Sequence, residues 1–342
     1  MLLGPAPLWS RGSAAARRRG LPPPVDSAPG GCVHCLDIIV GWECAACVVS
    51  CERDWSKLIY VDGPRSAGLL RRELCARNAE LARLNGCAHV PSYGEVPVTV
   101  YAPEPQGNRH GNFHTASYRA ILKREQWAVR LDKVHAQART TLPRAERRWR
   151  ELDSCVSSDA LLMNIFCCPG VCKRLTALLG TDSGDLPEFG YRARVPFRPS
   201  FSGKERFDRT EVDMKLGNLL VEAKLTESDF QMAPLERVKT YRDLEEVFDV
   251  TVLPRSGDRF VSYQLVRNVL AAHVGQLDFC VMLDARRPDL LEAWHAIMRA
   301  VKPVDLRTRC KVLTWQELSC AVPPGLRQFL RVKYGIVSPA LP

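Results

Sequence analysis

The sequence predicts an α/β fold in which helices flank a central mixed β-sheet, preceded by a cysteine-containing N-terminal region of poorly defined structure. Two observations lead to this prediction. Stretches with helical periodicity lie on both sides of a strand-rich centre, and Gly217-Asn218 joins two apolar runs there in the manner of a β-hairpin. The chain has 342 residues, of which 46% are hydrophobic and 25% charged. This composition indicates a globular protein with an ample core, and it excludes collagen-like, coiled-coil and wholly disordered chains.

Three regions follow one another along the chain. Residues 1–31 are rich in Pro, Gly, Ala and Arg, which predicts a disordered basic tail. Residues 32–117 combine short strand-like pieces with many prolines and glycines, and we expect a small cysteine-containing region of uncertain fold there. The periodic patterns become continuous after it, so residues 118–342 form the main predicted domain, with a basic helix at its start.

The first helices of the main domain follow from apolar spacing and capping residues. Apolar side chains recur from Ala120 at intervals of seven, four, three and four, which marks one face of a helix. Ser157-Ser158-Asp159 offers good N-cap residues for a second helix, which Pro169-Gly170 ends. A third helix is expected over Val171–Leu179.

Strands and helices alternate in the rest of the chain. A first strand is predicted over Tyr191–Phe197, and Thr210–Lys215 and Leu219–Leu225 are the arms of the hairpin. The remaining elements are helices over Leu235–Phe248 and Ser262–Ala272, a strand over Phe279–Leu283, a helix over Leu290–Ala300, and a strand over Val312–Thr314 before a last helix. A hairpin followed by helix-connected strands predicts a sheet that is antiparallel at first and then parallel.

Charge and cysteine content bear on the partner and the compartment. The formal net charge is +10, and residues 118–150 hold ten basic residues against three acidic ones, which points weakly to a polyanionic partner. The sequence has no run of 18 apolar residues, so we expect no transmembrane helix and no membrane partner. Fourteen cysteines without a secretion signal favour reduced thiols and a cytoplasmic location.

One segment, Thr210–Lys224, carries the chemistry. Asp213 lies on the first arm of the hairpin, and Glu222 and Lys224 lie two residues apart on the second, so all three can project from one face. Adjacent carboxylates repel each other unless a cation neutralises them, and oxygen ligands of this kind suit Mg²⁺ or Mn²⁺. A bound metal activates water, and Lys224 can hold that water or stabilise charge on a phosphate. The alternative is an exposed strand with a cross-strand ion pair.

The same residues resemble a family signature. Asp213, Glu222 and Lys224 are similar to the motif of the PD-(D/E)XK, or restriction-endonuclease-like, nuclease superfamily. Five blocks, over about residues 118–320, also occur in the order found in a bacterial group of restriction endonucleases: Ser157-Ser158-Asp159-Ala160 with Asn164, Thr210-x-x-Asp213, Glu222-Ala-Lys224-Leu-Thr-Glu227, Tyr263-Gln264-Leu-Val-Arg267-Asn268 and Thr314-Trp315-Gln316-Glu317. The chain departs from the group at Asp159, where Gln is expected, and from the superfamily at Val212, where its name has Pro.

The resemblance implies a restriction-endonuclease-like core and metal-dependent hydrolysis of DNA. It implies that Asp213 and Glu222 bind Mg²⁺ or Mn²⁺ and that Lys224 orients water. It also implies a further metal-binding acid upstream, for which Glu188 is the candidate; a solvated loop acid is the alternative. Gln264 resembles a glutamine that some members use near the active site, and otherwise it is a helix-surface residue.

Two weaker patterns complete the candidate sites. The paired spacing of Cys32, Cys35, Cys44 and Cys47 suits a structural Zn²⁺ site, with incidental cysteines as the alternative. A cluster of arginines around Trp149 can contact phosphates while the indole stacks on a base, or it can belong to a solvated basic helix. The arginines of this cluster are Arg144, Arg147, Arg148 and Arg150.

Together these features predict a metal-dependent endonuclease that hydrolyses DNA phosphodiester bonds, as a restriction-type enzyme. A repair or recombination nuclease is the alternative among enzymes. The alternative from another class is a non-catalytic nucleic-acid-binding protein with a degenerate nuclease fold. The sequence leaves open whether the protein is a monomer or a homodimer.

Overall fold

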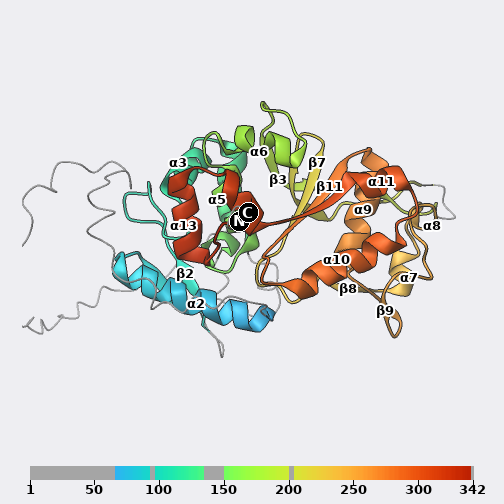
Figure 1. The fold of residues 1–342 in the computed structure, drawn as a ribbon, viewed down its shortest axis with the longest axis horizontal. Helices are drawn as coiled ribbons and strands as arrows, with labels where there is room; N and C mark the ends of the chain where they lie inside the picture. The colour runs from blue at the N-terminus through green and yellow to red at the C-terminus, as the bar shows by residue number, and fades with distance from the viewer. Residues whose placement is uncertain (1–65, 93–96, 135–149, 200–203, 340–342) are drawn as a thin grey trace, which may run out of the picture. The chain divides into compact units, whose positions relative to one another are not determined.

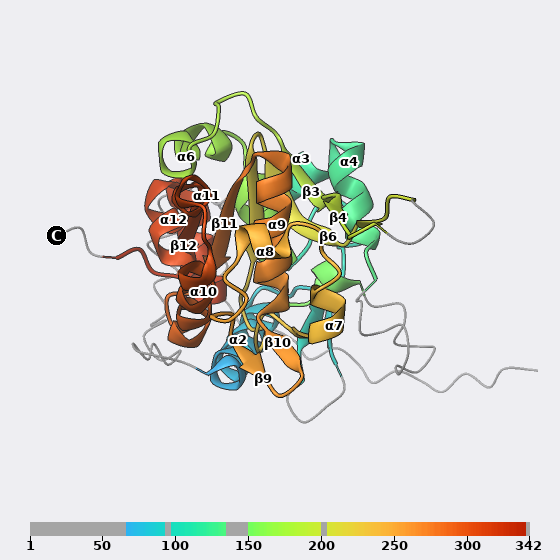
Figure 2. The same cartoon turned by 90° about the vertical axis from the view of Figure 1, so that its right-hand side faces the viewer.

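A five-stranded mixed sheet lies at the centre of the computed structural model, which describes residues 66–92, 97–134, 150–199 and 204–339. Its strand order is β12-β11-β7-β6-β3. In that order the strands are Cys310–Thr314, Asp278–Leu283, Leu219–Ala223, Glu211–Leu216 and Pro187–Arg192. β3, β6 and β7 are antiparallel, whereas β7, β11 and β12 run parallel. Helices flank this sheet (Figure 1 and Figure 2), which confirms the predicted α/β class.

The predicted hairpin forms from β6 and β7. Gly217 in its turn has a φ of +55°, and a Cβ there would overlap the Asp185 carboxylate, so this position requires glycine. The strand register places Met214 opposite Val221 and Leu216 opposite Leu219. One more step along the same register brings Asp213 opposite Glu222, as the tight turn predicts.

The two faces of the sheet carry separate hydrophobic clusters because neighbouring residues of a strand point to opposite sides. On β11, Cys280 and Met282 belong to the first cluster, and Phe279 and Val281 to the second. The helices of the first cluster are α2 (Ala67–Leu84), α5 (Ser158–Phe166), α6 (Val171–Leu179), α12 (Trp315–Ala321) and α13 (Pro324–Tyr334). Those of the second are α7 (Leu235–Val238), α8 (Leu244–Val247), α9 (Tyr263–Gly275), α10 (Pro288–Ala300) and α11 (Val304–Arg309).

Short elements connect these layers. The helical ones are α3 (Thr115–Leu122), α4 (Glu125–Ala128) and the 3₁₀ turns η3 (Val129–Asp132) and η5 (Glu151–Asp153). Two strand pairs are formed by β1 (His89–Pro91) with β2 (Thr99–Tyr101) and by β4 (Val195–Pro196) with β5 (Phe207–Asp208). A three-stranded sheet contains β8 (Met232–Pro234), β9 (Arg255–Ser256) and β10 (Arg259–Val261).

Two predicted helices are broken by tertiary contacts. The helix expected from Ala120 onward divides after Leu122, where Arg124 is extended and the buried Trp127 donates from its indole to the Pro187 carbonyl at 2.8 Å. The helix expected over Leu235–Phe248 divides into α7 and α8. Its buried Tyr241 forms a backbone bridge to Phe197, which a continuous helix could not make. In both places a large aromatic side chain and its backbone contacts outweigh the local helical pattern.

The helix α2 joins the core across residue 118, the boundary expected between the N-terminal region and the main domain. Its Leu70 and Leu74 are fully buried in the same cluster as Leu330 of α13. The basic tail expected over residues 1–31 lies outside the described residues, as do the four cysteines proposed for zinc.

Within the described part of the chain, no single helix has the length and apolar character needed to cross a membrane. Only when α5 and α6 are taken together are they long and apolar enough, and this pair is bent by 105° at its break. Both helices pack against the sheet, and all nine residues of α5 are buried, so core burial accounts for their apolar character.

Candidate active site

The hairpin brings the three predicted catalytic side chains together. Glu222 is 1% exposed, and its Oε1 accepts a hydrogen bond from Nζ of Lys224 at 2.7 Å. Its Oε2 accepts from Nδ2 of Asn268 on α9 at 2.8 Å. Asp213 lies opposite and accepts from the Ala223 backbone N–H at 2.7 Å. The Glu222 contacts are buried and the Asp213 contact is partly buried, so the ion pair of Glu222 with Lys224 does not lie on an exposed strand.

The two carboxylates of this group, Asp213 and Glu222, outnumber its one amine, Lys224. Loss of water around Asp213, together with the charges of Glu222 and Asp159, raises the pKa of its carboxyl well above the usual range. Burial disfavours the charged form of Lys224, but the carboxylates of Glu222 and Asp213 outweigh it and raise the pKa of the amine. Lys224 therefore stays protonated at neutral pH, and Asp213 lies where a further cation would relieve repulsion.

A polar pocket of about 320 Å³ opens beside Lys224. Gln264 at the start of α9 lines it, and its Oε1 is buried without a hydrogen-bond partner among the described residues. Glu227 also lines the pocket, and it accepts from the Ser158 hydroxyl at 2.5 Å and from the Leu225 N–H at 2.6 Å. The pocket thus brings the hairpin, α9 and the start of α5 to one polar space.

These contacts join residues from separate blocks of the sequence. The model of a family described as Restriction Endonuclease associating with ARP matches residues 89–335, which include every strand of the central sheet. The chain belongs to this restriction endonuclease family. Membership confirms the restriction-endonuclease-like resemblance seen in the sequence, and it makes the chain a nuclease of the restriction-endonuclease-like kind. Comparison with curated proteins and with solved structures yields no match.

An acid outside the predicted site residues interacts electrostatically with Asp213 of the hairpin. Asp159, 6% exposed in the first turn of α5, acts electrostatically on Asp213. It pairs with Lys133 at 2.6 Å and with Arg130 at 3.2 Å. Its only sequence signal is its place in the N-terminal block of the resemblance, where it appears as a departure from Gln.

Glu188, the acid proposed from the resemblance, does not join this group. It lies on β3 opposite Lys215, two residues from Gly190, the residue opposite Asp213, and it is exposed. Asp159 is thus an upstream acid whose charge contributes to the raised pKa of Asp213, and metal binding by Glu188 stays a prediction.

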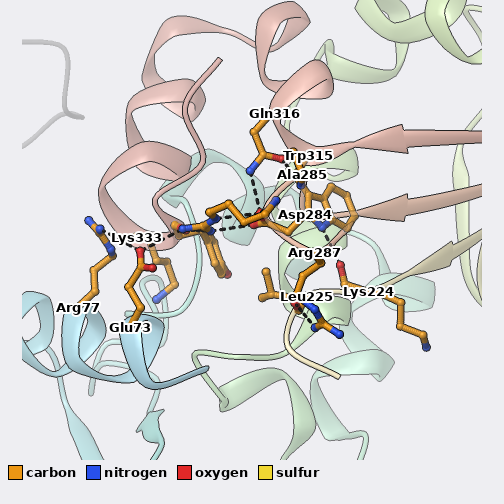
Figure 3. A network of polar contacts seen from close by, with 12 residues as sticks. Glu73, Arg77, Lys224, Leu225, Asp284, Ala285, Arg287, Trp315, Gln316 and Lys333 are labelled. Atoms are coloured by element: carbon orange, nitrogen blue, oxygen red, sulfur yellow. Dashed lines mark hydrogen bonds and ion pairs between the residues drawn. The ribbon is translucent and has the colours of Figure 1, made fainter. Parts of the chain in front are cut away.

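Two buried side chains fix the backbone that follows Lys224. Trp315 at the start of α12 donates from its indole N–H to the Lys224 carbonyl at 2.9 Å (Figure 3). Arg287, which is 0% exposed, donates to the carbonyls of Glu227 at 2.8 Å and Ser228 at 3.2 Å. Both residues lie far from the motif in sequence, so only their place in the fold reveals this role.

The donor set fits a divalent cation. Asp213 and Glu222 offer carboxylate oxygens from opposite strands, and burial together with the charges of Glu222 and Asp159 raises the pKa of Asp213. Within the described ranges, no three His, Cys, Asp or Glu side chains are arranged to share one ion. Two carboxylates and several waters would satisfy Mg²⁺ or Mn²⁺, which commonly keep part of their hydration shell.

The arginines proposed to contact nucleic acid lie mostly outside the described residues; this holds for Arg144, Arg147 and Arg148. Arg150 is exposed and pairs with Asp132 at 2.9 Å. An exposed ion pair of this type contributes little to stability, so Arg150 can exchange its partner for a phosphate at small cost.

Proposed function

We propose that this protein is a metal-dependent endonuclease that hydrolyses phosphodiester bonds of DNA as a restriction-type enzyme. One observation carries the proposal: the opposed carboxylates of Asp213 and Glu222 lie next to the protonated Lys224, which lines a polar pocket. Membership in a restriction endonuclease family supports DNA as the substrate.

Asp213 and Glu222 are the residues that would hold Mg²⁺ or Mn²⁺. When bound, such an ion supplies a water of lowered pKa and stabilises negative charge on the phosphate. Asn268 holds the Glu222 carboxylate in place through its amide, so that this oxygen keeps its orientation while the second oxygen faces Lys224.

Lys224 acts as a cation and not as a general base. Its raised pKa keeps the amine protonated, and a protonated amine can donate to a water or to a phosphate oxygen but cannot accept a proton. Gln264 lies in the same pocket with a free carbonyl oxygen, which can accept a hydrogen bond from the attacking water. These two side chains would orient the water from two sides.

Asp159 adds negative charge on the side of α5. It is paired with Lys133 and Arg130, and its charge still contributes to the raised pKa of Asp213. We propose that Asp159 strengthens the demand for a cation at Asp213 and takes the place that the sequence analysis assigned to Glu188.

A plasmid-nicking assay tests the proposal. Wild-type protein should cleave in Mg²⁺ and be inactive in EDTA, and Lys224→Ala should lose cleavage while still binding metal and remaining folded. Asn268→Asp is a useful second variant, because it keeps the shape of the Glu222 partner but replaces its donor with a repelling carboxylate. Unchanged cleavage by Lys224→Ala in Mg²⁺ would contradict the assignment; DNA binding without any cleavage by the wild type would favour the non-catalytic alternative.

A further inference from the structure

The pocket beside Lys224 receives a cation from a helix outside the family match. Arg71 lies in the second turn of α2, which ends at Leu84, whereas the match begins at residue 89. Its side chain lines the pocket together with Lys224 and Gln264. The helix α2 thus adds a residue to the pocket that the family signature does not include.

Arg71 is the cation in this pocket that is not neutralised by an acid. The cationic residues that line the pocket are Arg71 and Lys224. Lys224 forms an ion pair with Glu222 at 2.7 Å. Among the described residues, no carboxylate lies within 4.0 Å of the Arg71 guanidinium. An anion that enters the pocket therefore meets Arg71 as an available partner.

The lining acids do not neutralise Arg71 because each has other contacts or lies apart from it. Glu151 pairs with Lys133 at 3.1 Å, and Glu227 accepts from Ser158 and Leu225. Asp229 accepts from the Gln231 backbone N–H at 2.6 Å. The three acids make the pocket unfavourable for an anion unless a cation compensates them, so the position of Arg71 matters for anion binding.

The helix that carries Arg71 is held rigidly. Leu70 and Leu74 on either side of it are fully buried. One turn further on, Asn78 donates to the Lys333 carbonyl at 3.1 Å and accepts from Nζ of Lys333 at 2.6 Å. A side chain on such a rigid helix loses less freedom on binding a ligand than one on a loose loop.

A polar network links α2 to the strand end that carries Lys224 (Figure 3). Glu73 pairs with Arg286 at 3.0 Å, and Arg286 pairs with Asp284 at 2.8 Å. Gln316 donates to Asp284 at 2.9 Å, next to Trp315, whose indole binds the Lys224 carbonyl. The network sets the position of α2, and with it Arg71, relative to the catalytic lysine.

We propose that Arg71 binds a phosphate group of the nucleic-acid substrate in the pocket beside Lys224, and this rests on the proposed function. A guanidinium presents two parallel N–H donors to phosphate oxygens, a geometry that an ammonium cannot reproduce. The role fits an arginine because the site needs a fixed, permanently charged donor at the rim of an acidic pocket.

The matched variants are Arg71→Ala and Arg72→Ala. Arg72 is the next residue of the same helix, and it is exposed and outside the pocket lining, so its replacement makes the same change in net charge. Binding of a short fluorescent duplex DNA is measured by anisotropy in EDTA at several salt concentrations, and kcat and KM for plasmid nicking are measured in Mg²⁺.

Arg71→Ala should weaken DNA binding by about 10-fold, and it should reduce the slope of the logarithm of the binding constant against the logarithm of salt concentration by about one. Arg72→Ala should change the affinity and the slope by much less. Arg71→Lys should restore part of the affinity, because the charge returns without the paired donors. Equal effects of Arg71→Ala and Arg72→Ala, with both variants folded by circular dichroism, overturn the proposal.

The two readouts separate this inference from the proposed function. Loss of binding by Arg71→Ala in EDTA, together with absence of cleavage by the wild type, supports the phosphate contact and contradicts hydrolysis. Normal cleavage by the wild type with unaltered binding and kinetics in Arg71→Ala contradicts the phosphate contact and leaves the proposed function standing.

Discussion

Replacement of Asp213 by Asn distinguishes the functional role of this carboxylate from its effect on the fold. The variant keeps the shape of the side chain and an oxygen that can accept the Ala223 N–H, but it removes the charge that faces Glu222. We expect a protein that is inactive and more stable than the wild type when no metal is present. Active sites often contain such destabilising charges, because the function requires them.

The expected gain in the stability of Asp213→Asn follows from the strand register. Side chains directly opposite on antiparallel strands have Cβ atoms about 5 Å apart. Two unit charges at that separation repel by about 3 kcal/mol at an effective dielectric constant of about 20. Loss of the attraction between Asp213 and Lys224 offsets part of this gain, so we expect the free energy of unfolding to rise by about 1–2 kcal/mol.

Thermal unfolding in EDTA measures the change in stability. The midpoint should rise by about 2–5 °C in Asp213→Asn. Addition of Mg²⁺ should raise the midpoint of the wild type and have little effect on the variant, because a ligand that binds only the folded state stabilises it. Plasmid nicking by the variant should fall by at least about 100-fold, since loss of a metal ligand removes several kcal/mol of transition-state stabilisation.

Glu222→Gln is the control with the opposite expected effect on stability. Glu222 accepts from the buried Lys224 at 2.7 Å, so neutralising it leaves an ammonium without its charged partner and should cost about 3–5 kcal/mol. Both variants should be inactive. A lower melting point for Asp213→Asn than for the wild type in EDTA would refute the repulsion argument, and normal nicking by Asp213→Asn would refute its assignment as a metal ligand.

Two further predictions concern pH and the loop after Lys224. Loss of water and the charges of Glu222 and Asp159 raise the pKa of Asp213 in the folded state, so the folded protein binds this proton more tightly than the unfolded chain does. The contribution of Asp213 to stability is therefore fully present below pH 3.8, the ordinary pKa, and it is lost as the pH rises through the raised pKa of the folded state. In EDTA, the stability of the wild type should therefore decrease relative to Asp213→Asn between acidic and neutral pH, and a constant difference in denaturation midpoints contradicts this. Arg287→Lys should lower the free energy of unfolding by about 2–5 kcal/mol, because a single ammonium cannot satisfy the carbonyls of both Glu227 and Ser228 and the Asp289 carboxylate. Urea denaturation tests it, and wild-type stability in that variant shows that the contacts of Arg287 are dispensable.

The sequence by itself determined the hairpin and the residues it carries. Gly217-Asn218 allows only a tight turn, and the two-residue period of a strand then places Asp213 opposite Glu222 and aligns Glu222 with Lys224. These relations depend on residues at most 11 positions apart, so local geometry is sufficient. The alternation of strands and helices after the hairpin was predictable for the same reason, since each element has its own periodic pattern.

Only the tertiary structure decided which distant residues surround the hairpin. Asp159, Asn268 and Arg71 reach it from α5, α9 and α2, and no local pattern records which helix packs on which face of the sheet. The position of Glu188 relative to Asp213 depends on the register between β3 and β6, which no short turn fixes and which places Glu188 opposite Lys215. Local geometry therefore specifies the hairpin motif, whereas long-range packing specifies its charge balance and the residues that line the pocket beside it.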